Sequence, residues 1–157
     1  ANGGFKIYPK IIVDDKIKDQ PIDKFTPLYK DSKNIRIVQD AMFGSTNEVM
    51  GTSYRSRIND PKYQFAGKTG TAQVKKITER DRELDLKTFQ IPYEERDHAL
   101  YIAFGPYKQP RYALSILIEH GGNGSTTAAP MAKELFKLVI DRHTYRQSIN
   151  EKKYLEI

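Results

Sequence analysis

A lysine and two threonines set between glycines form the stretch of this sequence best suited to hold an anion. The segment Phe65–Val74 reads FAGKTGTAQV. Lys68 carries an ammonium group, Thr69 and Thr71 carry hydroxyl donors, and an open strand edge would add backbone N–H groups. We expect the segment to run along the edge of a sheet, with these three side chains facing one cleft. Such a combination is suited to bind a carboxylate.

The composition indicates a folded domain or part of one. The chain has 157 residues, of which 38% are hydrophobic and 29% are charged, within the range of globular proteins. A net charge of +6 suggests an anionic neighbour. Charges of both signs alternate along the chain, however, and we expect no nucleic-acid partner. A basic nucleic-acid-binding domain stays an alternative that a salt-dependent gel shift would test.

Residue types argue against several kinds of site. The sequence has no cysteine, which excludes disulfides and thiolate metal ligands within it. Its three histidines, His98, His120 and His143, are widely spaced and form no H-E-x-x-H motif, so we expect no metal and no cofactor. His98, beside Asp97 at the start of a strand, is interpreted as structural. No apolar run approaches the roughly 20 residues of a membrane helix.

Hydrophobic periodicity predicts an α+β fold, an antiparallel sheet with flanking helices. Alternating residues over 112–118 follow an apolar run over 99–104 and a six-residue turn, which is typical of an antiparallel hairpin. A third strand is expected over 63–74 and a short edge strand over 5–9. A strongly charged insertion over about 75–96 is expected to leave the sheet, partly as a helix over 78–86.

Two longer helices are expected to pack on this sheet. The first begins at an N-cap Ser32, ends at Gly44 and buries Ile35, Val38 and Met42. The second covers 127–141, is capped by Thr126 or Thr127 and buries an apolar stripe of Met131, Leu135, Leu138 and Val139. Its early Pro130 is tolerated in the first turn. The polar tail over about 143–157 is expected to fray.

Two glycine-rich patterns suggest nucleotide binding but do not meet its requirements. Gly67-Lys68-Thr69 matches the end of a phosphate-binding loop, but that motif needs a glycine at the position of Lys62 and a helix after the lysine. The run Gly121–Gly124 departs from G-x-G-x-x-G, because residue 127 is a threonine. We interpret that run as a strand-to-helix turn.

The residues around Lys68 resemble the Lys-Thr-Gly motif of penicillin-binding proteins and serine β-lactamases. The resemblance extends over nearly the whole chain, in matching order and spacing, to the elongation-type class B penicillin-binding proteins, which are serine D,D-transpeptidases. The stretches that carry it are Val38–Gly44, Ala66–Val74, Asp97–Tyr107, Ile118–Gly122 and Ala128–Pro130.

This resemblance implies a role for each residue of the motif. Lys68 would supply positive charge and protons near a catalytic serine, and Thr69 and Thr71 would bind the terminal carboxylate of a D-Ala-D-Ala stem peptide or of a β-lactam. The backbone N–H of Thr71 would be one of two oxyanion-hole donors. Gly70 would let the substrate backbone approach the strand.

The sequence departs from the family in lacking its nucleophile. No serine here is followed by lysine three positions later, as S-x-x-K requires. Three S-x-N matches, at Ser32, Ser45 and Ser148, are interpreted as coincidences, because that motif lies far upstream of Lys-Thr-Gly in the family. The whole of residues 1–157 is therefore expected to be the C-terminal segment of one transpeptidase domain of partial penicillin-binding-protein fold. We expect it to be inactive alone.

The family also implies where the protein works and with what. An N-terminal membrane anchor, outside this chain, would place the domain on the periplasmic face of the bacterial inner membrane. Expected partners are stem peptides, β-lactams, the N-terminal remainder of the same protein and other cell-wall synthesis proteins. An alternative is a non-catalytic module of the same fold that binds peptidoglycan or docks a wall-synthesis partner through the insertion.

Overall fold

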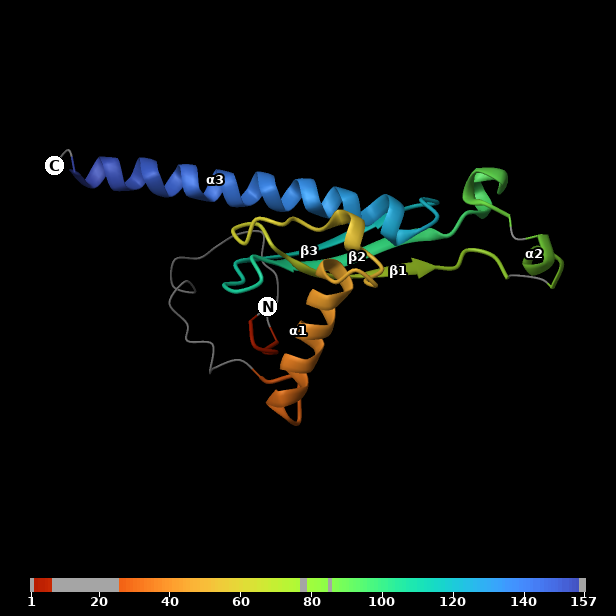
Figure 1. Ribbon diagram of the computed structural model, residues 1–157, viewed down its shortest axis with the longest axis horizontal. Coiled ribbons are helices and arrows are strands. Elements are labelled where there is room, and N and C mark those ends of the chain that lie inside the picture. The colour runs from red at the N-terminus through yellow and green to blue at the C-terminus, as the bar shows by residue number, and fades with distance from the viewer. Residues whose placement is uncertain (1, 7–25, 77–78, 85, 156–157) are drawn as a thin grey trace.

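The computed structural model describes residues 2–6, 26–76, 79–84 and 86–155 (Figure 1). Its helices and strands are α1 (Ser32–Asn47), β1 (Ala66–Ala72), α2 (Glu79–Leu84), β2 (His98–Gly105), β3 (Tyr112–Ile118) and α3 (Ala129–Leu155). Short helical turns lie at Tyr54–Ser56, Thr88–Gln90, Tyr93–Glu95 and Gly124–Ala128. Of the expected N-terminal strand, Phe5 forms an isolated bridge to Pro27, and residues 7–9 lie outside the described residues.

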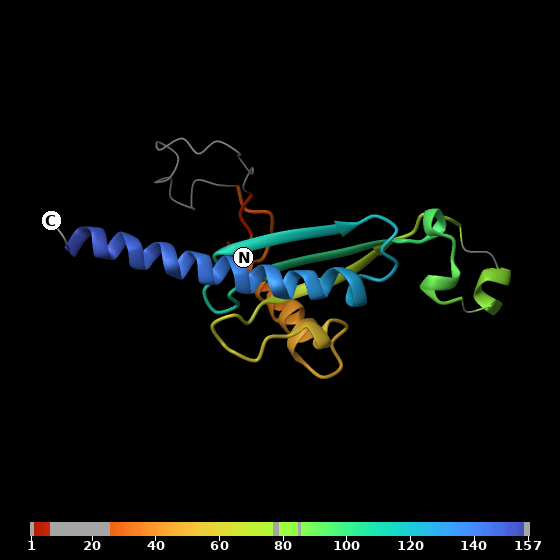
Figure 2. The same ribbon diagram turned by 90° about the horizontal axis from the view of Figure 1, so that it is seen from above.

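The three strands form one antiparallel sheet in the order β1-β2-β3, so the strand that carries Lys68 lies at an edge. The register places Thr69 opposite Tyr101, and Tyr101 opposite Ile116. Helix α3 lies along one face of the sheet, and α1 crosses on the other side (Figures 1 and 2). This arrangement confirms the predicted α+β class, and the hairpin of β2 and β3 lies where the alternation placed it.

The core lies between the sheet and α3. Side chains alternate between the faces of a strand, and alternate residues of β2, among them Ala99, Tyr101 and Ala103, are buried in the core. From β3, Leu114 and Ile116 pack against the same cluster. The intervening residues point to the other face of the sheet, where Ile102 is 51% and Leu117 is 57% exposed.

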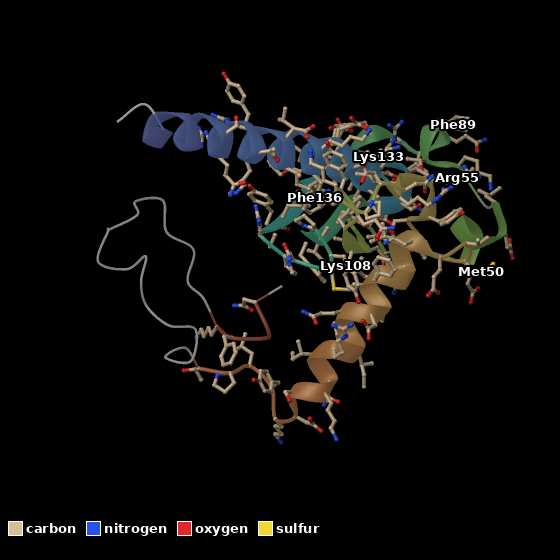
Figure 3. All side chains as sticks on the ribbon, turned by 60° about the vertical axis from the view of Figure 1, so that its left-hand side comes forward. Met50, Arg55, Phe89, Lys108, Lys133 and Phe136 are labelled. Atoms are coloured by element: carbon tan, nitrogen blue, oxygen red, sulfur yellow. The ribbon has the colours of Figure 1, made fainter. Side chains whose placement is uncertain are left out.

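Helix α3 packs through a different face from the predicted one. Met131, Leu135 and Leu138 are 51%, 42% and 64% exposed, and of the expected stripe only Val139 packs against the core. The buried face instead consists of Ala129, Ala132, Phe136 and Ile140, and Ala128 of the preceding turn is buried with them. Alanine lets the helix approach the sheet closely, and Phe136, labelled in Figure 3, then stacks on Phe65 at a centroid distance of 4.9 Å.

The ends of α3 also differ from the prediction. Asn123 caps the preceding turn, its side chain accepting a hydrogen bond from the backbone N–H of Ser125, so Thr126 and Thr127 are not the cap. The helix continues past Asp141 to Leu155, which means that the tail expected to fray is helical over most of its length. No helix among the described residues is long and apolar enough to cross a membrane.

Helix α1 begins one residue earlier and ends three residues later than predicted. Asp31, not Ser32, is the N-cap and accepts from the N–H of Lys33 at 2.9 Å. Gly44 does not end the helix, which continues to Asn47, and the side chain of Asn47 donates to the carbonyl of Phe65, the residue before β1, at 2.9 Å. Val38 is 55% exposed, so this part of the predicted buried face is wrong.

The charged segment over 75–96 extends from the end of the sheet, as predicted (Figure 1). It holds α2 and two of the short helical turns, and the described part of it is mostly exposed. Asp97 anchors its base by accepting from the N–H of Val74 at 3.1 Å. Lys75 and Glu95 form an ion pair at 2.7 Å across the same base.

Candidate functional site

The candidate site lies on the outer edge of β1. Lys68 and Thr71 are exposed and Thr69 and Gly70 are partly exposed, so the four motif residues are accessible on the strand. The strand begins at Ala66 and ends at Ala72, shorter than the predicted 63–74. Its N-terminal residues Ala66 and Gly67 are buried, which fixes the motif to the core at one end.

The direction of the backbone groups follows from a contact at Gly67. Its N–H donates to the hydroxyl of Thr46 on α1 at 3.1 Å, so it points away from β2. In an antiparallel strand the N–H and C=O of one residue point to the same side, and the side alternates along the chain. The N–H groups of Thr69 and Thr71 therefore also point to the outer edge. This places two backbone donors beside the two threonine hydroxyls.

Lys68 reaches the same edge from the other face of the strand. The pleat places its Cβ on the opposite face of the strand from those of Thr69 and Thr71. The ammonium nevertheless bends back, with Nζ 2.9 Å from the carbonyl oxygen and 3.4 Å from the hydroxyl of Thr69. The structure thus joins Lys68 to Thr69, and Thr71 lies two residues further along the same edge.

A buried hydroxyl cluster, formed by Thr46, Ser53 and Tyr101, holds this edge in place. The Tyr101 hydroxyl lies 3.0 Å from that of Thr46 and 3.1 Å from that of Ser53, and the Thr46 and Ser53 hydroxyls are 3.2 Å apart. All three residues are at most 1% exposed. Burial raises the pKa of Tyr101, which keeps its phenol neutral and able to donate.

Sequence reasoning missed this cluster. Thr46 and Ser53 lie in a stretch without core periodicity, and Tyr101 is separated from them by about 50 positions along the chain. Gly67 offered one signal, since a glycine inside a strand indicates close approach of another group. The ring of Tyr101 occupies the space that a Cβ at position 67 would need.

A second row of hydroxyls leads to Thr69 along the surface. The Thr52 hydroxyl lies 3.2 Å from that of Thr69 and 3.1 Å from that of Ser45. Ser45 belongs to the last turn of α1, and Thr52 to the loop that follows it. The carbonyl of Ser45 accepts from both the N–H and the hydroxyl of Ser53, each at 3.0 Å, which ties this loop to the buried cluster.

The histidines and the glycine-rich run have structural contacts. Nδ1 of His98 accepts from the N–H of His120 at 2.9 Å, and Nδ1 of His120 lies 3.1 Å from the carbonyl of Arg96. Gly122, in the turn after β3, has a φ of 79° and packs against the side chain of Thr88. Within the described residues, no group of three or more histidine or acidic side chains could hold a metal ion.

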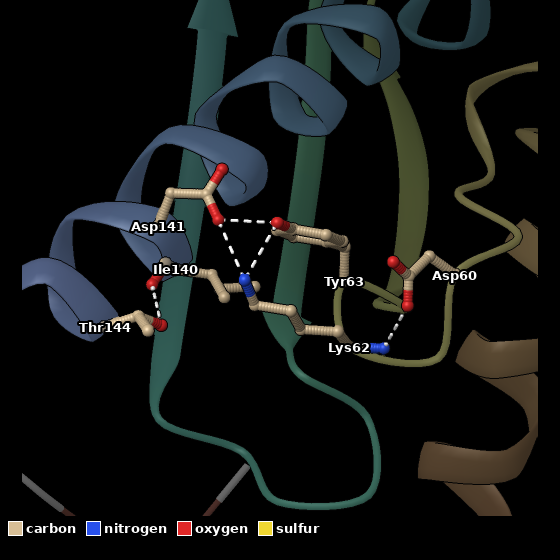
Figure 4. A network of polar contacts seen from close by, with 6 residues as sticks. All are labelled: Asp60, Lys62, Tyr63, Ile140, Asp141 and Thr144. Carbon is tan, nitrogen blue, oxygen red and sulfur yellow. Dashed lines mark hydrogen bonds and ion pairs between the residues drawn. The ribbon is translucent and has the colours of Figure 1, made fainter.

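A polar network closes the opposite, N-terminal end of β1. Asp141 of α3 accepts from Tyr63 at 2.5 Å and from Lys62 at 3.0 Å, and Lys62 also donates to Tyr63 at 2.9 Å (Figure 4). The hydrogen bond from Tyr63, followed by that from Lys62, lowers the pKa of Asp141. The network borders a pocket of about 330 Å³ at the turn of the hairpin. It joins α3 to the segment that leads into β1.

Known proteins resemble this chain over most of its length. The family described as penicillin binding protein transpeptidase domain matches residues 1–137. The peptidoglycan D,D-transpeptidase MrdA of Salmonella typhimurium is 36% identical over 105 residues, which is 67% of this chain and 16% of that protein. MrdA of Acinetobacter baumannii is 42% identical over 81 residues, or 50% of this chain and 11% of that protein.

Solved structures agree with these relatives. Penicillin-binding protein PBP2 of Helicobacter pylori, in a complex with MreC, has a TM-score of 0.59 and 29% identity, covering 80% of this chain and 20% of that one. PBP2 of Pseudomonas aeruginosa has a TM-score of 0.54 and 29% identity, covering 71% of this chain and 20% of that one. The chain thus spans about a fifth or less of the length of these proteins. With its family match over residues 1–137, it belongs to the penicillin-binding protein transpeptidase domain family.

Proposed function

We propose that this chain is the substrate-holding part of a peptidoglycan D,D-transpeptidase, and that the outer edge of β1 binds the terminal carboxylate of a D-Ala-D-Ala stem peptide or of a β-lactam. The observation that supports this most is that the Lys68 ammonium lies beside Thr69 on an edge strand, to whose outer side the N–H groups of Thr69 and Thr71 point. Charge-assisted hydrogen bonds from such groups are the strong ones. The relatives named above bear the same activity in their names.

In this proposal each residue of the motif has a separate task. Lys68 places positive charge beside the incoming carboxylate and serves proton transfer near the nucleophile. Thr69 and Thr71 donate their hydroxyl hydrogens to the carboxylate. The N–H of Thr71 stabilises the oxyanion, a contribution of about 3 kcal/mol to the barrier in enzymes where one donor was removed. Gly70 leaves space for the substrate backbone.

The serine nucleophile is supplied by a part of the protein outside this sequence. Its oxygen attacks the carbonyl of the penultimate D-Ala, the bond to the terminal D-Ala nitrogen breaks, and that D-Ala leaves with a proton. The amine of a neighbouring stem peptide then attacks the acyl-enzyme and releases the serine. The chain is inactive without the part that carries S-x-x-K. The intact protein works on the periplasmic face of the inner membrane.

Covalent labelling of the full-length protein by a fluorescent penicillin tests this function. We expect a labelled band that survives denaturation, and a strongly reduced labelling rate in Lys68→Ala. Thr144→Val, which removes a hydroxyl on α3 far from the edge, is the matched control and keeps the wild-type rate. The segment 1–157 alone is not labelled. An unlabelled wild type, or a Lys68→Ala variant labelled at the wild-type rate, contradicts the proposal.

A second candidate function is the binding of a wall-synthesis partner. The segment over 75–96, which carries Phe89 (Figure 3), presents apolar side chains to solvent. Phe89 is 79%, Tyr93 58% and Leu84 54% exposed. Exposed aromatic residues are more common at interfaces than on the remaining surface. The solved Helicobacter pylori relative is in a complex with MreC, which favours a partner of that kind. Loss of co-purification with such a partner in Phe89→Ser, with labelling by penicillin intact, would support this role.

A further inference from the structure

The hydroxyls of Ser45, Thr52 and Thr69 form a row that ends at the candidate carboxylate site. Successive oxygens are 3.1 and 3.2 Å apart, within hydrogen-bonding distance. Each hydroxyl has one hydrogen to donate and can accept from its neighbours. The row can therefore run in either of two directions, and the direction decides what the Thr69 hydroxyl offers to a ligand.

Lys68 limits the directions in which the Thr69 hydroxyl can donate its hydrogen. Its ammonium group can only donate, so the Thr69 oxygen, 3.4 Å away, is the acceptor in that contact. The single hydrogen of Thr69 then goes either back to Thr52 or outward to a ligand. If it goes back to Thr52, the side of the hydroxyl that faces a bound carboxylate carries a lone pair, which repels the anion.

The productive direction runs from Ser45 to Thr52 and from Thr52 to Thr69. In that direction Thr52 donates to the Thr69 oxygen and leaves the Thr69 hydrogen for the carboxylate. Hydrogen bonds in a chain polarise one another, so each donation strengthens the next. An anion at the edge of β1 favours this direction because its charge attracts the last hydrogen.

The loop that carries Thr52 is held firmly enough to fix this geometry. The next residue, Ser53, is 1% exposed and bonds to Thr46, Tyr101 and the carbonyl of Ser45. On the other side, the N–H of Gly51 donates to the carbonyl of Glu48 at 2.8 Å. Thr52 itself is exposed, so its side chain contributes little to the core.

We propose that Thr52, supported by Ser45, is a positioning residue that directs the Thr69 hydroxyl hydrogen toward the substrate carboxylate. This inference rests on the proposed function, in which Thr69 binds that carboxylate. It assigns a role to a residue outside the Lys-Thr-Gly motif. It also predicts an effect that depends on the negative charge of the ligand, which a purely structural role for Thr52 would not produce.

The experiment compares acylation of the full-length protein by a penicillin with a free carboxylate and by its methyl ester. Thr52→Val keeps the shape of the side chain and removes the hydroxyl. We expect its second-order acylation rate to fall about fivefold for the free acid, because the Thr69 oxygen loses the neutral hydrogen bond from Thr52 that polarises its hydroxyl, and less than about twofold for the ester. Thr52→Ser restores most of the rate, and Ser45→Ala shows a smaller loss for the acid alone.

The controls separate this inference from the proposed function. Thr144→Val is expected to change neither rate. Equal losses for acid and ester in Thr52→Val, or no loss in either, overturn the positioning role while the wild type still prefers the acid. A wild type that is not acylated, or that reacts with acid and ester alike, instead contradicts the proposed function and removes the basis of the inference with it.

Discussion

At the scale of single residues, the contacts of Gly67 with buried side chains connect the Lys-Thr-Gly motif to the core. The ring and hydroxyl of Tyr101 lie where a Cβ at this position would be, and the N–H of Gly67 is bonded to Thr46. The neighbouring glycine of the motif is different, because a Cβ at Gly70 would meet the nearest atom, Cβ of Leu100, at 3.3 Å. These two glycines therefore have different tolerance for a methyl group.

We expect Gly67→Ala to lower the free energy of unfolding by about 1–3 kcal/mol, because Tyr101 must move and its hydroxyl leaves the buried cluster. Gly70→Ala is the matched control and is expected to change stability by much less. Urea unfolding of the two variants of the full-length protein measures the difference. Equal stability of both variants and the wild type would contradict the close packing of Tyr101 on Gly67.

A pH prediction belongs to Asp141. Its pKa is lowered in the folded state by hydrogen bonds from Tyr63 and Lys62, relative to an ordinary value of about 3.9. A lowered folded-state pKa contributes stability above the ordinary pKa, and this contribution is lost as the pH falls through the folded-state value. Asp141→Asn is therefore expected to be less stable than the wild type at pH 7, and the difference in stability is expected to disappear as the pH falls below about 4.

Thermal unfolding between pH 2 and 7 measures this convergence. Glu134→Gln, which changes an exposed carboxylate on the same helix, is the control and is expected to stay parallel to the wild type. A stability difference between Asp141→Asn and wild type that persists unchanged at pH 2 would show that the network does not act through the charge of Asp141.

At the scale of elements, the sheet was easier to predict than the helices. Strand β3 follows from alternation, because one face of the hairpin is buried against α3 and the other is not, and β2 follows from its apolar run. The buried face of α3 was predicted wrongly, because its large residues Met131, Leu135 and Leu138 were taken as the core and its alanines were not. A helix that packs closely on a sheet needs small residues at the contact. The periodicity of the large apolar residues does not show which face carries them.

Removing the largest buried residue of α3 tests this assignment of faces. Phe136 is fully buried and stacks on Phe65, so Phe136→Ala is expected to lower the free energy of unfolding by about 3–5 kcal/mol. Leu138→Ala, two positions along at 64% exposure, is expected to change it by less than about 0.5 kcal/mol. Similar effects of the two substitutions on urea unfolding would show that the helix packs through the other face.

The candidate site was predictable in its residues but not in its support. The types and spacing of Lys68, Thr69 and Thr71 indicated carboxylate binding before any fold was known, and β1 is indeed an edge strand. The hydroxyls of Ser45, Thr46 and Thr52 gave no such signal, since isolated serines and threonines are common in loops and at helix ends. Only the folded chain brings them to β1, through contacts between distant segments.

At the scale of the whole molecule, we propose that the chain supplies one wall of a larger site. The sheet and α3 form a core, while Ile102 and Leu117 stand exposed on the face of the sheet away from that core. The sequence contains no S-x-x-K, and it spans 16% of the length of a curated relative. In our proposal the nucleophile approaches the outer edge of β1 from the remainder of the protein.

The most direct test of carboxylate binding at the outer edge of β1 is a crystal structure of the full-length protein acylated by a penicillin. We predict that the penicillin carboxylate lies about 2.7–3.2 Å from the hydroxyls of Thr69 and Thr71, and that the acyl carbonyl oxygen lies within the same range of the Thr71 N–H. A carboxylate bound away from the edge of β1, with Lys68, Thr69 and Thr71 facing only solvent, would contradict the account.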